Sequence, residues 1–125
     1  MFKQIIASIG IGDAKIDTKL NKKEYHIGEQ IQGIITFENL EGLHIDHIEL
    51  TLFESFKNDD ETSEFSTIDE PIAQVTLQPK NGETISFEMD TKNVNLKDDR
   101  QYFIKTHVFV DNAVDYYDED EIIFI

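Results

Sequence analysis

The chain has 125 residues, of which 39% are hydrophobic, and this is enough apolar material for one core but not for two. Its 26 acidic and 11 basic residues give a net charge of −15, which argues against binding to nucleic acid or to an anionic membrane, because both carry negative charge. The chain has no cysteine and no apolar run near the ~20 residues of a membrane-spanning helix, so we expect no disulfide, no thiol nucleophile and no membrane insertion.

The first ten residues follow a helical pattern. Their large apolar side chains recur at i, i+3, i+4 and i+7, and these are Phe2, Ile5, Ile6 and Ile9. We expect a short amphipathic helix over residues 1–10, ended by Gly10, that packs on its own domain or anchors a partner. Gln4 and Ser8 interrupt the apolar region too early for a signal peptide, so the expected location is the cytoplasm.

From residue 14 onward apolar and polar residues alternate, as they do in half-buried strands. About seven strands are predicted, at 16–20, 31–37, 48–56, 73–77, 85–89, 102–110 and 121–125. Segment 102–110 is apolar on both faces, which is typical of a central strand. Turn residues, of which Asn81-Gly82 is the clearest pair, separate the runs. The pattern predicts an all-β protein in which residues 14–125 form one antiparallel sandwich.

Segment 57–70 is polar and acidic, and its large apolar side chains are Phe65 and Ile68. It forms either a long surface loop or, in the interpretation that we favour, a hairpin in which residues 63–68 pair with the strand that ends near Phe56. In both cases the two apolar side chains are candidates for contact with a partner.

The histidines and acidic clusters do not match known metal sites. His44 and His47 are three apart in a predicted strand, so they should point to opposite faces, and His107 is expected to be hydrogen-bonded within the core. Residues 115–121 hold five carboxylates, but they lack the alternate spacing and the glycine of a calcium loop. We interpret them as a solvated acidic turn before the last strand, and residues 59–61 in the same way.

No catalytic pattern is visible. The sequence has no nucleophile elbow, no glycine-rich phosphate loop and no serine beside an evident histidine base, so we expect neither enzyme activity nor a cofactor or metal. A β-sandwich that binds a ligand or calcium stays open as the alternative to a protein-binding role, since Tyr116 and Tyr117 could stack on a sugar.

Two stretches carry a family resemblance. The first is 7–18, which begins Ala-Ser-Ile-Gly-Ile-Gly, together with 25–33, and the second is 106–115 together with 118–120. Over essentially its whole length the chain resembles the amino-terminal half of the bacterial sporulation-control proteins with an arrestin-like fold. The resemblance implies an immunoglobulin-like (arrestin N-domain-like) antiparallel β-sandwich that serves as a non-catalytic regulatory scaffold or adaptor for protein partners in the cytoplasm.

In that family a second, similar sandwich follows, and here the chain stops where the first would end. A surface covered in longer relatives should therefore be open, and the strand ending in Ile-Ile-Phe-Ile is expected to pair by its edge, in a homodimer or with a partner's added strand. The residues predicted to contact a partner are Phe2, Ile5, Ile6, Ile9, Phe65, Ile68, Ile123 and Ile125.

Overall fold

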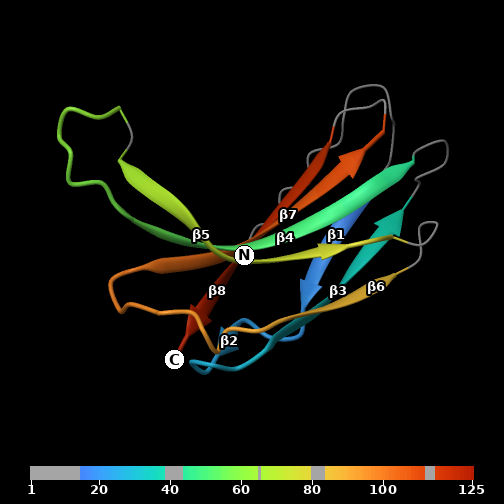
Figure 1. Ribbon diagram of the computed structural model, residues 1–125, viewed down its shortest axis with the longest axis horizontal. Coiled ribbons are helices and arrows are strands. Elements are labelled where there is room, and N and C mark those ends of the chain that lie inside the picture. Colours follow the sequence, from blue (N-terminus) through green and yellow to red (C-terminus); the bar gives the residue numbers. More distant parts are fainter. Residues whose placement is uncertain (1–14, 39–43, 65, 80–83, 112–114) are drawn as a thin grey trace.

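The computed structural model describes residues 15–38, 44–64, 66–79, 84–111 and 115–125. Eight strands run through them: β1 (Lys15–Leu20), β2 (Glu24–Tyr25), β3 (Ile31–Glu38), β4 (Ile45–Lys57), β5 (Thr67–Leu77), β6 (Ile85–Met89), β7 (Gln101–Val110) and β8 (Tyr116–Phe124). They form a three-stranded sheet in the order β1-β3-β6 and a five-stranded sheet in the order β2-β8-β7-β4-β5 (Figure 1). The predicted all-β class is confirmed, and the helix predicted for residues 1–10 lies outside the described residues.

The core lies between the two sheets. Buried side chains come from both layers, among them Ile16 and Ile35 of the smaller sheet and Leu50 and Ile104 of the larger one. β7 lies between β8 and β4, as its two apolar faces predicted, and its residues alternate between buried and half-buried. Burial of each aliphatic side chain stabilises the folded state by roughly 1.5–3 kcal/mol relative to leaving it exposed to water. No helix in the described part of the chain has the length and apolar character needed to cross a bilayer.

β2 was not predicted, so the described residues hold eight strands where about seven were expected. It consists of two residues, which lie parallel to the end of β8 with Tyr25 opposite Phe124. The sandwich is therefore antiparallel except at this pair. A strand of two residues is too short to show an alternating pattern, so the sequence does not reveal it. Its pairing with the neighbouring strand specifies it.

The predicted hairpin of β4 and β5 is confirmed. Phe56 lies opposite Ile68, and one further hydrogen bond joins Asn58 N to Ser66 O at 2.9 Å. The strand begins at Thr67, later than predicted, and Ser63 lies in the turn. Figure 1 shows this hairpin as an arm that reaches beyond the rest of the sheet.

The five-stranded sheet is strongly curved, and its concave side faces away from the three-stranded sheet (Figure 1). The register between β4 and β5 shifts between Leu52 and Phe53, next to Pro71 on the edge strand. An irregularity of this kind bends a strand and increases its local twist. The outward face of the sheet is thus a hollow surface, which we call the concave face. The residues that line its middle are Glu49, Thr51, Phe53, Pro71, Gln74, Lys105, His107 and Tyr117.

The acidic turn predicted for residues 115–121 is wrong. Residues from Tyr116 onward belong to β8, and Asp118 and Asp120 point into the sandwich with 2% of their surface exposed. Oδ2 of Asp118 accepts a hydrogen bond from the backbone N of Thr18 at 2.9 Å. A buried carboxylate needs such donors, and this one is supplied by a strand far away in the sequence.

Candidate functional site

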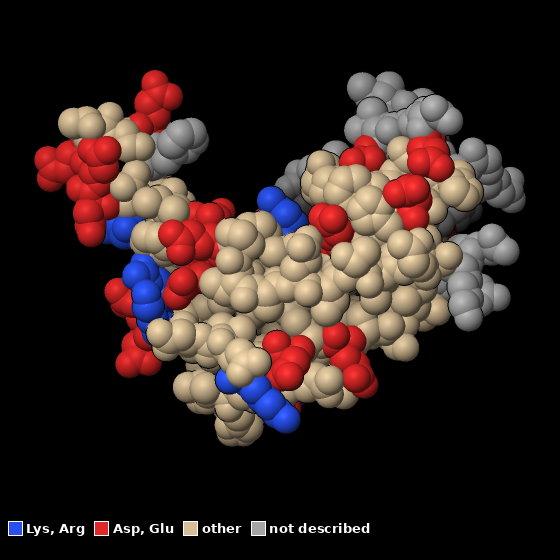
Figure 2. Space-filling view, viewed as in Figure 1, with Lys and Arg blue, Asp and Glu red and all other residues tan. Residues whose placement is uncertain are grey.

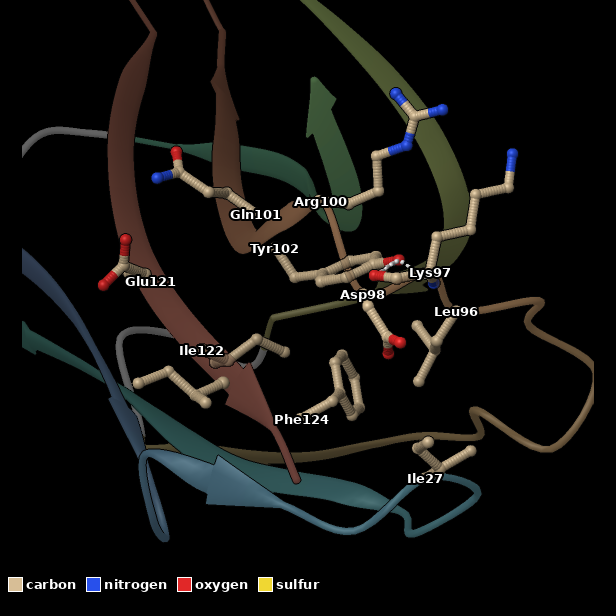
Figure 3. A pocket seen from close by; sticks show the side chains of 11 residues that line it. Ile27, Leu96, Lys97, Asp98, Arg100, Gln101, Tyr102, Glu121, Ile122 and Phe124 are labelled. Carbon is tan, nitrogen blue, oxygen red and sulfur yellow. Dashed lines mark hydrogen bonds between the residues drawn. The ribbon is translucent and has the colours of Figure 1, made fainter. Parts of the chain in front are cut away.

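A pocket of about 360 Å³ lies where β7 begins and β8 ends, and we call it the β8 pocket. Its apolar lining comes from the end of β8 and from two loops, and consists of Ile27, Leu96, Ile122, Ile123 and Phe124. Figure 3 shows Ile27, Leu96 and Phe124 close together, whereas the charged ends of Lys97 and Arg100 extend away from them. The pocket therefore has an apolar interior and a charged rim.

The inner wall of the pocket is fixed by Tyr102. Its hydroxyl accepts a hydrogen bond from Lys97 N at 2.8 Å and donates one to Oε1 of Glu54 at 3.1 Å, and its ring meets Phe124 edge-on at 5.3 Å. Burial raises the pKa of Tyr102, and the hydrogen bond to Glu54 raises it further. The hydroxyl therefore stays protonated at neutral pH and holds the wall in place.

Arg100, the one arginine of the sequence, is held beside this wall. Its guanidinium lies over the ring of Phe56 at 3.9 Å, and Nε lies 3.8 Å from Oε1 of Glu54 and 3.4 Å from Asp99. The Nε contacts are ionic, because they fall outside good hydrogen-bond geometry and Nε has no hydrogen-bond partner. Sequence analysis missed this group, although a single arginine beside an aromatic-rich strand was a usable signal.

Exposed isoleucines extend the apolar surface of the pocket outward. Ile27, Ile123 and Ile125 are 67%, 40% and 58% exposed. On the side that faces β2, Ile123 N donates to Lys23 O at 3.0 Å and Ile125 N to Tyr25 O at 2.8 Å, so β2 occupies this edge at the end of β8. Edge pairing with a partner or a second copy stays a prediction. Ile27, in the turn before Gly28, was not predicted.

The concave face carries a second set of grouped side chains. Four rings stack across three strands in the order His47, Phe109, His107 and Tyr117, with successive centroids 4.1, 3.7 and 4.3 Å apart. A hollow of about 400 Å³ lies beside this stack, over the middle of the sheet. Aromatic rings covering one another in this way leave a rigid and partly apolar surface.

The prediction for His107 is corrected by this arrangement. His107 lies on the concave face and not in the core, with Nε2 2.8 Å from Oδ2 of Asp115. His47 is in β4, where a hydrogen bond to Asp46, and then one to Glu49, raises its pKa. His44 precedes β4 and lies 2.5 Å from Asp111, so the two histidines do not share a site. Within the described residues, no group of three or more His, Cys, Asp or Glu side chains is placed to hold a metal ion.

The remaining predicted contact residues are dispersed. Ile68 is half-buried in the hairpin opposite Phe56, and it is not among the residues that line the β8 pocket with Ile123. The other five lie outside the described residues, namely Phe2, Ile5, Ile6, Ile9 and Phe65. Of the eight, the structure places two at one surface.

The architecture defines the class, a β-sandwich of two unequal sheets with the larger one curved. The chain belongs to the Spo0M family, because the model of the family described as SpoOM protein matches residues 2–124. It is 27% identical to the sporulation-control protein spo0M of Bacillus subtilis (strain 168) over 144 residues, which cover 91% of this chain and 55% of the relative. The predicted family is thereby confirmed.

Solved structures agree on the fold. The crystal structure of Spo0M from Bacillus subtilis superposes with a TM-score of 0.66 at 23% identity, over 95% of this chain and 50% of that one. A superoxide reductase (neelaredoxin) from Ignicoccus hospitalis gives a TM-score of 0.51 at 16% identity, over 90% and 79% of the two chains. At these identities the likeness shows the fold alone. The chain spans about half the length of the sporulation-control relative.

Proposed function

We propose that this chain is a non-catalytic regulatory adaptor that binds protein partners in the cytoplasm. The name of its relative, a sporulation-control protein, supports the regulatory part of this proposal. The observation that carries the proposal is the β8 pocket with its exposed isoleucines. A protein partner inserts an apolar side chain into the pocket and covers Ile27, Ile123 and Ile125 around it.

A protein fits this surface better than a small molecule does. Small-molecule sites enclose most of their ligand, whereas here the apolar surface continues outside the pocket onto side chains that are 40–67% exposed. Apolar surface of that kind, bordered by the charged groups of Lys97, Arg100 and Glu121, is typical of protein interfaces. The hydroxyl of Tyr102 is already hydrogen-bonded on both sides, which supports a structural and not a catalytic role for it.

The test is site-specific photo-crosslinking in the cells from which the chain comes. A benzophenone amino acid replaces Ile27, and the matched control carries it at Ile34, which is 37% exposed on the three-stranded sheet. We expect a discrete adduct from position 27 that position 34 does not give. The crosslinked protein, once purified, should bind the chain and lose about tenfold or more in affinity with Ile125→Glu but not with Ile34→Glu.

Light scattering across a wide concentration range identifies self-association. An adduct of twice the chain's mass, together with a dimer that dissociates in Ile123→Glu, would make a second copy of the chain the partner at this surface. Absence of any adduct specific to position 27, or binding that is indifferent to Ile125→Glu, would overturn the proposal.

A further inference from the structure

We propose that the concave face of the five-stranded sheet binds a segment of a protein partner in which lysine or arginine alternates with apolar residues. The inference rests on the proposed protein-binding function, but it concerns another surface and can fail independently. The concave face lies along β4, β7 and β8, and Tyr117 is six residues, or ~20 Å, from Ile123 at the β8 pocket.

Apolar rings form part of the floor of the concave face, beside polar side chains such as Glu49, Thr51 and Lys105. Phe53 and Phe103, opposite each other on β4 and β7, stack at 5.4 Å, and Tyr117 closes the ring stack with 36% of its surface exposed. Pro71 borders the same hollow on the edge strand. Such a floor accepts the apolar side chains of a partner and the methylene stems of its basic ones.

Acidic side chains stand on both sides of this floor. Figure 2 shows them gathered on the hairpin arm on one side and on the opposite end of the molecule on the other, with the hollow between. The acidic residues of the arm include the exposed Asp59, Asp60 and Glu61. Glu119 is exposed on β8, where it lies opposite Lys105 in the middle of the sheet. A basic segment is therefore drawn into the hollow from either side, and a segment of negative charge is repelled.

The chain already places one ammonium group on this floor. Nζ of Lys105 lies 5.4 Å from the ring centroid of Phe53, and Lys105 is directly opposite Glu119 on the neighbouring strand. An aromatic ring face and a carboxylate together stabilise a cation. The surroundings of Lys105 thus show which side chain the surface accepts, and Lys105 itself competes with the incoming cation for that position.

The experiment measures binding of a synthetic peptide of alternating lysine and leucine by calorimetry, beside a peptide in which glutamate replaces lysine. The test variant is Glu49→Gln with Glu119→Gln, on the concave face. The control is Glu38→Gln with Glu88→Gln, exposed on the three-stranded sheet, which changes the net charge equally. We expect about a tenfold loss of affinity in the test variant and less than about a twofold loss in the control.

Two further variants sharpen the result. Lys105→Met should tighten binding of the lysine peptide severalfold, because it removes the competing cation. Tyr117→Ala should weaken binding even at high salt, where attraction between charges is screened. Native-like amide spectra of each variant exclude unfolding as the cause.

Equal losses in the test and control variants would overturn the proposal, because binding would then follow net charge alone. Equal binding of the glutamate peptide, or no binding of the lysine peptide, would also overturn it. The crosslink at Ile27 should persist in the Glu49→Gln, Glu119→Gln variant. A crosslink at Ile27 in the chain with intact Glu49 and Glu119, together with no binding of the lysine peptide by that chain, would remove this inference and leave the proposed function standing.

Discussion

The buried carboxylate of Glu54 makes the stability of the fold sensitive to the side chains around it. It is 6% exposed and depends on the hydroxyl of Tyr102 and on the cation of Arg100. Removing one partner of a buried charge leaves the other uncompensated. We predict that Arg100→Met lowers the free energy of unfolding by ~3 kcal/mol. Urea unfolding at neutral pH measures the change.

A double-mutant cycle isolates the cause. Glu54→Gln keeps an acceptor for Tyr102 but removes the charge, so Arg100→Met should cost about 1 kcal/mol or less in that background. A cost for Arg100→Met that is the same with and without Glu54→Gln would show that stacking on Phe56, and not charge, is what Arg100 contributes.

Gly33 and Gly28 are structural for two different reasons. A Cβ at Gly33 would lie 2.6 Å from Lys19 O and 2.9 Å from the ring of Phe87, whereas Gly28 has open space and a φ of 86°. We predict that Gly33→Ala costs about 2 kcal/mol or more, by overpacking, and Gly28→Ala about 1 kcal/mol, by backbone strain. Thermal unfolding of the two variants, measured side by side, tests the order.

Residue-scale prediction failed where a side chain's partner is remote in the sequence. Asp118 and Asp120 follow tyrosines in an acidic run, which indicates a solvated turn. The donor that makes burial of Asp118 acceptable is Thr18 N, in another sheet. Likewise nothing local shows that Ile27 lies beside Phe124. Only the assembled fold brings these residues together.

At the scale of elements, the short pairing of β2 with β8 can be tested for its contribution to stability. Ile123→Pro removes the N–H that donates to Lys23 O, and should cost ~3 kcal/mol of stability. Ile123→Thr keeps the N–H and the branched side chain, and is the matched control. Urea unfolding compares them. Stability equal to that of the control would mean that the β2 pairing contributes nothing to the fold.

The connection between β7 and β8 predicts a pH dependence. Burial would raise the pKa of Asp115, but hydrogen bonds from Val110 N and from His107 outweigh it and lower the pKa below its usual value. As the pH falls, the unfolded chain takes up the proton first. The stability that Asp115 contributes is therefore complete above pH ~4 and is lost as the pH falls through its folded pKa.

Asp115→Asn should accordingly lower the free energy of unfolding by about 1–2 kcal/mol at neutral pH, and by much less at the acid end of the titration. Unfolding by urea from neutral pH downward, with Asp59→Asn at an exposed position of the hairpin arm as a control, measures the difference. A penalty that does not shrink with acidification would mean that shape, and not charge, is what the site requires.

At the element scale, periodicity predicted the strands that have a buried and an exposed face. It located β1, β3, β4, β6 and β7 to within a few residues, because alternation is imposed by the pleat itself. It failed for β2, which is too short to alternate, and for the first half of β8, whose inward positions carry aspartate. The β8 pocket combines residues 121–124, which were predicted as strand, with Ile27 and with residues 96–98 and 100–102. Its lining could not have been predicted, because only the fold brings these distant segments together.

For the whole molecule, two surfaces of different character are available on one sandwich. The β8 pocket is apolar with a charged rim, and the concave face is aromatic with acidic sides. The two proposals place these surfaces at different positions on one sheet, so a chain that bound both partners would hold them at a fixed separation, as the proposed adaptor role requires. The two proposed binding surfaces are tested with separate control variants, so an experiment can overturn one proposal and leave the other unaffected.

The net charge of −15 leads to the last prediction. Repulsion among 26 carboxylates destabilises the compact state, and salt screens it. The melting temperature at neutral pH should therefore rise by roughly a few degrees between very low and physiological ionic strength. Sodium, magnesium and calcium chloride at equal ionic strength distinguish screening from a site. Similar stabilisation by all three is the expected result. A saturable rise with calcium beyond magnesium would instead support the calcium-binding alternative, since a ligand that binds the folded state alone raises its melting temperature.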